Sequence, residues 1–439
     1  MSWNKIKLGD ILSESKIISE SPNPDRRITV RLKVLGVEKR GLENEVEGAT
    51  KQYIRRAGQF IYGKQNFHKG AFGIIPPELD GFESSSDLPA FDVDKSCLPE
   101  YIFYFFKQGN YYLELSKIAS GVATQRINTS QLFEMQLFLP DIETQKKIIT
   151  NIQILENKGA KISSELNNQI SLLKRLRQQL LQDAVQGKLV SQNPKDEPAS
   201  ELLKKIKAEK EKLIAEKKLK KEKELAPIKP EEIPFEIPEN WVWCRLGEIC
   251  TKIGSGSTPK GSNYSNSGKP FFRSQNIYDS GLIYDDIKFI SDDVHKQMNG
   301  TTVFGNDILL NITGGSMGRC ALVPKDFDEG NVSQHVCIIR PLVVDKSFYH
   351  SMILSPFFQK FIFSSTTGAG REGLPKYNLE QFIIPLPPYA EQNRIVQKLE
   401  ELMQYCDELE ASIKESESQN EKLLQQVLRE ALRKEPVEV

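Results

Sequence analysis

The chain has 439 residues, 39% of them hydrophobic, and its 59 Lys and Arg residues balance 59 Asp and Glu residues. This length exceeds one ordinary hydrophobic core, so we expect two or more domains. The formal net charge of zero excludes a global basic field for nucleic acid, so any DNA binding must come from local patches or be shared with a more basic partner.

The six Cys residues are dispersed and form no CxxC pair. This pattern favours reduced thiols in a cytoplasmic protein over a disulfide framework or a zinc site. The opening MSWNKIKLGDIL has no apolar signal-peptide core, and no stretch reaches the run of about 18 apolar residues that a membrane span needs. We therefore expect a cytoplasmic protein with no membrane segment.

Residues 1–143 are predicted to form a first globular module. Within them, YIRRAGQFIYGKQNFHKGAFGIIP places Arg, Lys, Gln, Asn and His between apolar runs with strand character. Such side chains can bond base edges, Arg or Lys to guanine and Asn or Gln to adenine. Ordinary polar loops between strands would look the same, so composition alone leaves both interpretations open.

Residues 144–190 are predicted to form a long helix, because apolar residues recur there at a spacing of three and four. The pattern is a narrow seam about six turns or longer, which is typical of a helix that pairs with another helix. Polar residues interrupt the seam at Gly159 and Gln169. Residues 191–240 follow as a charged linker, with a solvated Lys/Glu-rich helix and then an extended Pro-rich run.

The rest of the chain repeats this layout. Residues 241–388 are predicted to form a second module and residues 389–435 a second long helix. NWVWCRLGEIC matches SWNKIKLGDIL at an offset of 238, and Pro140 and Gln145 recur as Pro387 and Gln392 at an offset of 247. The second seam is interrupted at Ser416 and Asn420, and the simplest partner for each seam is the other.

Three tempting motifs lack the context that their chemistry needs. GAGREG (368–373) matches G-x-G-x-x-G, but Leu-Pro and then the long helix follow it, so it favours a contact loop over a dinucleotide site. LPPYAEQ contains the Pro-Pro-Tyr of amino-methyltransferase loops, yet Leu386 stands where a hydrogen-bond acceptor is needed. The four His residues show no metal-ligand spacing, and no Walker A sequence occurs. These features predict a binding protein without a catalytic site of its own.

The chain resembles the specificity subunits of type I restriction–modification systems over essentially its whole length. The residues that carry the resemblance are the Trp-x4-Leu-Gly starts at Trp3 and Trp241, the two Pro…Gln helix openings, LLQDAVQGKLVSQNPKDEPASELLKKIKAEK and IPFEIPENWVWCRLGEI. The resemblance implies an α/β (α+β) fold of two modules in tandem repeat. Two globular DNA target-recognition domains would be joined by two long helices that form an antiparallel coiled coil.

The resemblance also implies a function. Each module would recognise one half of a split, asymmetric site in double-stranded DNA, and the chain would scaffold two methylation subunits and two restriction subunits. S-adenosylmethionine, ATP and Mg would belong to those partners, so this chain would bind no cofactor or metal and catalyse nothing. Related possibilities are a type IIB enzyme or a defence system that methylates without cutting. A different possibility is a coiled-coil adaptor with paired ligand-binding modules and no role on DNA.

The expected DNA contacts lie in polar loops of both modules. In module one they are Lys64, Gln65, Asn66, His68, Lys69, Ser84, Ser85, Ser86, Gln125 and Arg126. In module two they are Arg273, Ser274, Gln275, Asn276, Thr313, Ser316, Arg319, Ser333, Gln334, His335, Arg371 and Lys376. The expected helix–helix interface is Ile148, Ile152, Leu155, Ile162, Leu166, Leu173, Leu176, Leu180, Ile395, Leu399, Leu402, Leu409, Ile413, Leu423 and Val427.

Overall fold

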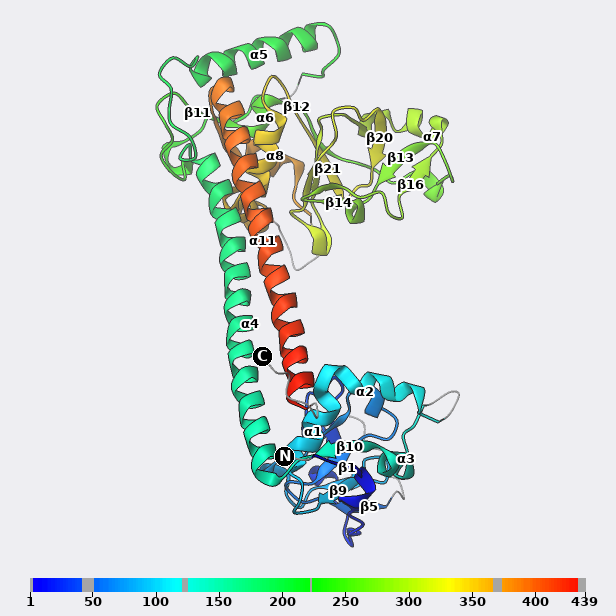
Figure 1. Ribbon diagram of the computed structural model, residues 1–439. Coiled ribbons are helices and arrows are strands. Elements are labelled where there is room, and N and C mark those ends of the chain that lie inside the picture. The colour runs from blue at the N-terminus through cyan, green and yellow to red at the C-terminus, as the bar shows by residue number, and fades with distance from the viewer. Residues whose placement is uncertain (1–2, 42–50, 121–124, 222, 366–372, 433–439) are drawn as a thin grey trace. The chain divides into compact units, whose positions relative to one another are not determined.

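The structure is a computed structural model that describes residues 3–41, 51–120, 125–221, 223–365 and 373–432 (Figure 1). The chain divides into two compact units. Unit 1 comprises Met1–Gln169 and Ser412–Val439, and unit 2 comprises Ile170–Ala411. Among the described residues, no helix is long and apolar enough to cross a membrane.

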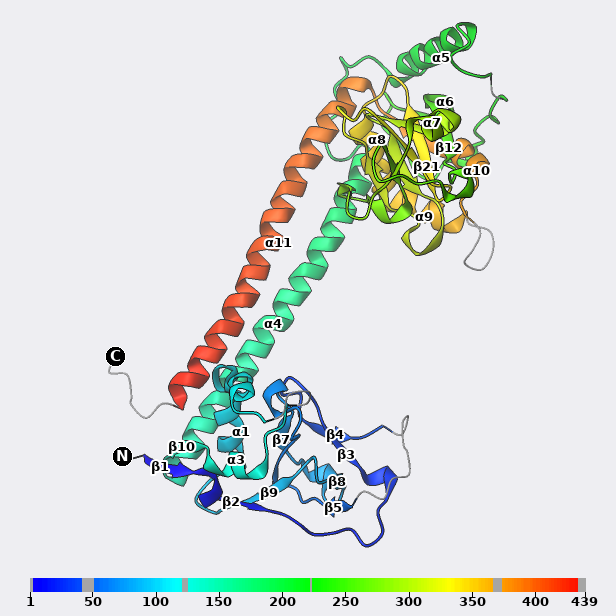
Figure 2. The ribbon, with the colours of Figure 1, turned by 90° about the vertical axis from the view of Figure 1, so that its right-hand side faces the viewer.

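Unit 1 is built on an antiparallel sheet of four strands in the order β2-β9-β6-β7 (Figure 2). These strands are β2 (Leu12–Glu14), β9 (Ala90–Val93), β6 (Phe60–Tyr62) and β7 (Phe72–Ile74). The smaller strand pairs are β1 (Asn4–Lys7) with β10 (Gln136–Leu139), β3 (Ile28–Val30) with β4 (Val37–Lys39), and β5 (Gln52–Ile54) with β8 (Glu83–Ser85). The helices of this module are α1 (Pro99–Lys107), α2 (Tyr111–Glu114) and α3 (Thr129–Glu134).

The central strand β6 is buried on both faces, which follows from its sequence Phe-Ile-Tyr. Because side chains alternate along a strand, Phe60 and Tyr62 point to one face and Ile61 to the other. Phe60 stacks on Phe106 of α1 with ring centroids 5.8 Å apart. Ile61 lies in a second cluster that contains Ile28 of β3. The sheet of module one is therefore covered by α1 on one face and by the β3–β4 hairpin on the other.

Unit 2 repeats the same sheet with strands at the positions that the sequence repeat predicts. The order is β12-β21-β18-β19, from β12 (Cys250–Ser255), β21 (Val336–Pro341), β18 (Ile308–Asn311) and β19 (Cys320–Leu322). β11 (Val242–Arg245) pairs with β22 (Ile383–Leu386), as β1 pairs with β10. The aligned turns also share their backbone, because Gly70 and Gly318 have φ angles of 82° and 89°. The predicted tandem repeat is therefore confirmed.

Unit 2 has a second sheet of four strands in the order β16-β13-β20-β17. Its strands are β16 (Lys288–Ile290), β13 (Lys269–Phe272), β20 (Glu329–Val332) and β17 (Thr302–Phe304). The remaining strands are β14 (Ile277–Tyr278) and β15 (Gly281–Leu282), and the short helices are α6 (Leu246–Ile249), α7 (Asp292–Gln297), α8 (Lys346–Leu354), α9 (Pro356–Ser364) and α10 (Lys376–Gln381).

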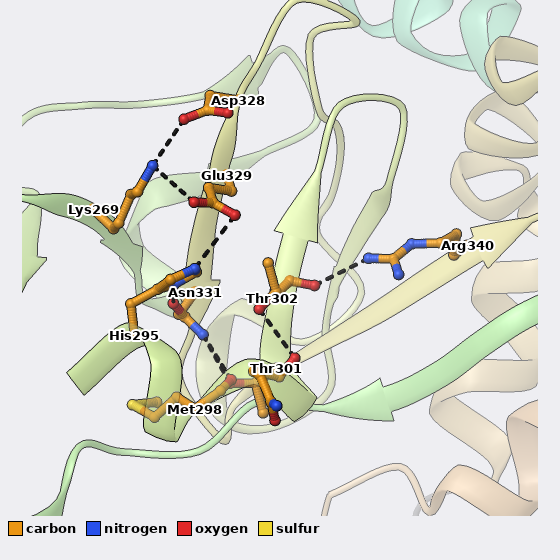
Figure 3. A network of polar contacts seen from close by, with 10 residues as sticks. Lys269, His295, Met298, Thr301, Thr302, Asp328, Glu329, Asn331 and Arg340 are labelled. Carbon is orange, nitrogen blue, oxygen red and sulfur yellow. Dashed lines mark hydrogen bonds and ion pairs between the residues drawn. The ribbon is translucent and has the colours of Figure 1, made fainter. Parts of the chain in front are cut away.

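A polar network holds β20 in this second sheet (Figure 3). Asn331 is fully buried, and its Nδ2 donates to the Met298 carbonyl at 3.1 Å while its Oδ1 contacts His295 of α7. The other ring nitrogen of His295 lies 3.4 Å from Glu329. Lys269 Nζ lies 2.8 Å from Glu329, and its hydrogen bond lowers the pKa of that carboxyl. The network fixes the strand that leads directly into Ser333.

The two long helices are α4 (Ile142–Val185) and α11 (Tyr389–Ala431), and parts of both lie in each unit. In unit 1, Asn420 Nδ2 donates to the Gly159 carbonyl and to Ser163 Oγ, each at 3.1 Å. In unit 2, Arg177 forms ion pairs with Asp407 at 2.7 Å and Glu410 at 3.2 Å. Position 177 of α4 thus contacts positions 407 and 410 of α11, whereas the earlier positions 159 and 163 contact the later position 420. The two helices therefore run antiparallel, as predicted.

The packed seam differs from the predicted one at four positions. Ile162, Leu176, Leu409 and Leu423 are 45–61% exposed, so their prediction as interface residues is wrong. The packed line instead runs through Gly159 and Asn420, which the sequence pattern marks as interruptions, and through Ser163. A helix interface predicted from the spacing of apolar residues alone is misplaced wherever a small or polar residue occupies an interface position.

The repeated Pro…Gln phrase is the joint between each module and its helix. Gln145 is fully buried, accepts from the Leu98 amide at 2.8 Å, and donates to the Ser96 and Pro140 carbonyls. Gln392, also fully buried, accepts from the Asp345 amide at 2.8 Å and donates to the Pro387 carbonyl at 2.9 Å. One amide side chain thus satisfies backbone groups that the strand-to-helix junction leaves unpaired.

The linker is packed against module two. Its helix α5 (Ala199–Ala215) buries Ala199, Leu202 and Ile206 in the main core cluster of unit 2, so the expected solvated helix is correct only for its Lys/Glu face. Arg245, 5% exposed, donates to the Ala226 and Pro227 carbonyls of the Pro-rich run and pairs with Glu232 at 2.9 Å. The run is therefore anchored by a buried guanidinium.

Candidate nucleic-acid interface

In unit 2, the predicted contact segments meet at one edge of the sheet, because neighbouring strands end or begin there. β18 ends at Asn311, whose Nδ2 donates to the Ser274 carbonyl at 2.9 Å. The amide of Ile312 donates to the His335 carbonyl at 3.0 Å, and the amide of Leu374 donates to the Ile312 carbonyl at 2.9 Å. Segments 273–276, 313–316 and 333–335, which are far apart in sequence, therefore form one surface.

The side chains on this surface form an exposed polar chain. Thr313 Oγ1 lies 2.7 Å from His335 Nδ1, and Gln334 Nε2 lies 3.2 Å from His335 Nε2. Thr258 hydrogen-bonds to Gln334 through its hydroxyl, although sequence reasoning did not select it. The signal that could have found Thr258 is its place in the Gly/Ser-rich loop GSGSTPKG, which the second module carries as an insertion.

A second group on this surface is centred on Asp286. Arg273 and Gln275 each donate to Asp286 Oδ2 at 3.0 Å. Hydrogen bonding from Arg273 is the main cause of the lowered pKa of Asp286. Asn276 is fully buried and holds its own turn by donating to the Ile283 and Asp285 carbonyls, so the prediction that it contacts DNA is wrong. An Asn that caps a turn and an Asn that reads adenine look the same in sequence.

The remaining predicted residues of module two are placed differently. Arg319 lies over the Tyr278 ring with 4.6 Å from its guanidinium carbon to the ring centroid, and Ser316 Oγ accepts from Asn311 at 3.2 Å. Lys376 is exposed and pairs with Glu380 at 2.9 Å one turn along α10. Arg371 lies outside the described residues. The contacts proposed for these residues stay predictions.

Unit 1 assembles its predicted loops at the equivalent edge. The amide of Lys64 donates to the Asp87 carbonyl, and the amide of Ile127 donates to the Lys64 carbonyl, each at 2.9 Å. Arg126 lies 3.7 Å from Asp87. The Ile127 bond corresponds in the repeat to the bond from Leu374 to Ile312. The loops at 64–69, 85–87 and 125–126 therefore share one edge, where Lys69, Ser86 and Gln125 are exposed and Gln65, Asn66 and Ser85 are half-buried.

Two residues at this edge differ from the others: Ser84 has a structural role, and His68 has a lowered pKa. Ser84 is 2% exposed, accepts from Arg55 Nε at 2.6 Å and donates to the Leu88 carbonyl at 2.7 Å, so the prediction that it contacts DNA is wrong. Burial and the neighbouring Lys69 lower the pKa of His68, which keeps its ring neutral at physiological pH. A neutral imidazole offers one donor and one acceptor.

Buried polar atoms without a hydrogen-bond partner gather at these two edges. Seven such side-chain atoms occur among the described residues, and four belong to the loops above: His68 Nδ1, Arg273 Nε, Asn311 Oδ1 and Ser333 Oγ. Three of these four atoms lie in unit 2 and one in unit 1, and each is able to form a further hydrogen bond. Donors and acceptors of both kinds are present, as recognition of base edges requires.

Comparison with known proteins adds a family and a fold. The family model for the type I restriction modification DNA specificity domain matches residues 2–172 and 238–416. The EcoAI and EcoEI type I restriction enzyme specificity subunits of Escherichia coli are 34% and 36% identical to this chain over 278 and 273 residues. Each alignment covers 60% of this chain but only 46% and 45% of the relative, so the chain spans less than half the length of these two proteins.

A solved structure from work on complex assembly and conformational transition of the type I R-M system matches 98% of both chains, with a TM-score of 0.62. Its sequence identity to this chain is 19%, so this likeness shows the fold alone. The fold that it shares is two modules in tandem with long helices, as the sequence predicts.

Proposed function

Because the chain belongs to the type I restriction modification DNA specificity family, we propose that it is the sequence-recognition subunit of a DNA-modifying complex. Each module recognises one half of a bipartite site in double-stranded DNA. The paired helices set the gap between the halves. The chain supplies the sequence specificity, and its partner subunits catalyse the reactions.

The observation that carries this proposal is that both units present the same strand-end edge with different side chains. Gln65 of module one occupies the repeat position of Thr313, and His68 that of Ser316. The backbone bonds that build the two edges correspond, as with Ile127–Lys64 and Leu374–Ile312. The two modules thus share a backbone arrangement but differ in the side chains that it presents, which is suited to two half-sites of different sequence.

The partners follow from the family and belong to the same proposal. Two methylation subunits would transfer a methyl group from S-adenosylmethionine to adenine, and two restriction subunits would use ATP and Mg to move and cut DNA. All of them would work in the cytoplasm. The zero net charge of this chain is consistent with DNA enclosed jointly with more basic partners.

The test is methylation mapping. The chain is co-expressed with the methylation subunit encoded beside it in a host without adenine methylation, and the genome is sequenced by a method that detects N6-methyladenine. We expect one split motif of two short half-sites around a fixed gap. A stable complex that methylates nothing and binds DNA without salt dependence would instead favour the adaptor function.

A further inference from the structure

We propose that the β3–β4 hairpin of module one, residues 26–40, is a further DNA-binding element that enters a groove of the duplex beside the half-site of that module. This inference rests on the proposed function. It concerns residues outside the loops described above. Among the residues that the structure describes, module one carries this basic ribbon and the corresponding strand pair of module two has no Lys or Arg.

The first support is charge. Residues 26–40 contain six basic residues and one acidic residue, in a chain whose net charge is zero. Arg31 pairs with Glu38 at 3.4 Å, and both side chains are more than half exposed. Lys33, Lys39 and Arg40 are exposed and form no ion pair with any other residue that the structure describes. Unneutralised cations on a short ribbon are suited to DNA phosphates.

The second support is position. The amide of Lys33 donates to the Lys69 carbonyl, and the amide of Val34 donates to the Gly70 carbonyl, each at 2.8 Å. The hairpin tip is thus hydrogen-bonded to the turn Phe67–Lys69 and Gly70, which belongs to the loop 64–69 at the edge of the predicted contacts. Gly70 permits the approach, because a Cβ atom there would lie 2.9 Å from the Val34 nitrogen.

The third support is the tip itself. Lys33 and Val34 both have positive φ angles, 57° and 59°, which a β-branched residue such as Val34 rarely adopts. This backbone presents Leu35 and Leu32 outward, 71% and 44% exposed, between the cations. Ile28 and Val30 are buried in the cluster that contains Ile61, so the ribbon packs against the sheet of module one. A two-stranded ribbon has a width that fits the major groove, where apolar side chains such as Leu32 and Leu35 can contact thymine methyl groups.

The element of module two that meets the equivalent turn, residues 277–282, contains no Lys or Arg of its own. It is the β14–β15 pair, whose turn carries Asp279, and Asp279 Oδ1 accepts from the Cys320 amide at 3.1 Å. That carboxylate is used to hold the turn, and its charge would repel phosphate. The hairpin therefore makes the two modules bind DNA unequally, and module one forms the stronger contact with phosphates.

The test measures binding at several salt concentrations. The full-length chain is purified with its methylation partner, and two duplexes are used, one with the motif found by mapping and one with both half-sites scrambled. The hairpin variant is Lys33→Ala/Lys39→Ala/Arg40→Ala. The matched control is Lys147→Ala/Lys158→Ala/Lys161→Ala, which removes three exposed cations from α4 of unit 1.

We expect the hairpin variant to reduce the slope of log affinity against log salt by about 3 on both duplexes, because each phosphate contact contributes roughly 0.9. The control should keep the wild-type slope. Leu35→Ser should weaken binding without changing the slope, and in hydroxyl-radical footprinting it should remove protection beside the half-site of module one. A hairpin variant with the wild-type slope, or equal losses in variant and control, would overturn the inference and leave the proposed function standing. A wild-type complex that binds neither duplex would overturn both.

Discussion

At the scale of single residues, a buried glutamine makes equivalent hydrogen bonds in each module. Gln145 and Gln392 are fully buried and bond only to backbone groups of their own unit. Gly9 and Gly247 are a second such pair, because a Cβ atom at Gly9 would lie 2.9 Å from Phe133 and one at Gly247 would lie 3.1 Å from the Glu380 carbonyl. Both pairs of repeated residues therefore lie where an element of the module meets a helix, the glycines against α3 and α10 and the glutamines at the start of α4 and α11.

We predict that Gln392→Leu lowers the free energy of unfolding of unit 2 by about 2–4 kcal/mol. The variant leaves the Asp345 amide and the Pro387 carbonyl buried without partners, and each such group costs about 1–3 kcal/mol. Hydrogen-exchange mass spectrometry should place the loss in unit 2, and Gln145→Leu, which leaves three backbone groups without a partner, should place a loss at least as large in unit 1. Gln397→Leu, an exposed position on the same helix, is the control and should change neither unit.

Glu391 makes a prediction about pH. It accepts from Trp241 Nε1 at 3.0 Å and from Gln192 Nε2 at 2.5 Å, and burial raises its pKa in spite of these bonds. A raised pKa in the folded state means that ionisation costs more there than in the unfolded chain. The stability contribution is therefore most favourable below the unfolded pKa and is lost as pH rises through the folded pKa.

Glu391→Gln should remove this dependence while keeping an acceptor for Trp241. The difference in unfolding free energy between the variant and the wild type should grow as pH rises above the ordinary glutamate pKa and then become constant. Denaturant unfolding at a series of pH values measures it. A difference that is flat across the acidic range would contradict the assignment.

At the scale of elements, the long helices pair through a seam that is partly polar. Asn420 lies over Gly159 and bonds to its carbonyl and to Ser163, all within unit 1. A buried Asn in a helix pair favours one register, because other registers leave its amide without partners, and it does so at some cost in stability. The polar interruption is thus a means of aligning α4 and α11.

We predict that Asn420→Leu leaves unit 1 equally stable or more stable by about 1 kcal/mol, since an apolar residue replaces a polar one in the seam. The register should then be less strictly set. In methylation mapping, the variant should modify sites with more than one gap length, while the bases of each half stay the same. Gln419→Leu, on the exposed side of the same helix, should keep a single gap. A single gap in Asn420→Leu would refute the role in register.

At the scale of the whole molecule, the two modules are expected to act independently. Gln65→Ala in module one should relax the half-site that this module recognises, and His335→Ala should relax only the other. Each should cost about 1–3 kcal/mol of discrimination at one or two base pairs, which is the usual value of a good base contact. The methylated motifs of the two variants measure this. A change in both halves from one substitution would show that recognition is shared between the modules.

The sequence by itself determined the architecture. The repeat, the offset of 247 residues and the apolar periodicity predict two modules and two long helices, and the structure contains both. These features are visible because they depend on local patterns: alternation in strands, a spacing of three and four in helices, and Pro at their starts. The resemblance to a known family then supplies the proposed function.

Only the tertiary structure decided which polar residues face outward. Ser84 and Asn276 look like contact residues in sequence but are buried on backbone partners, and Thr258 joins the surface through Gln334. Likewise Gly159 and Asn420 occupy the seam, while Leu409 and Leu423 lie outside it. Burial and hydrogen bonding depend on groups brought in from distant parts of the chain, and no local pattern records where those groups arrive.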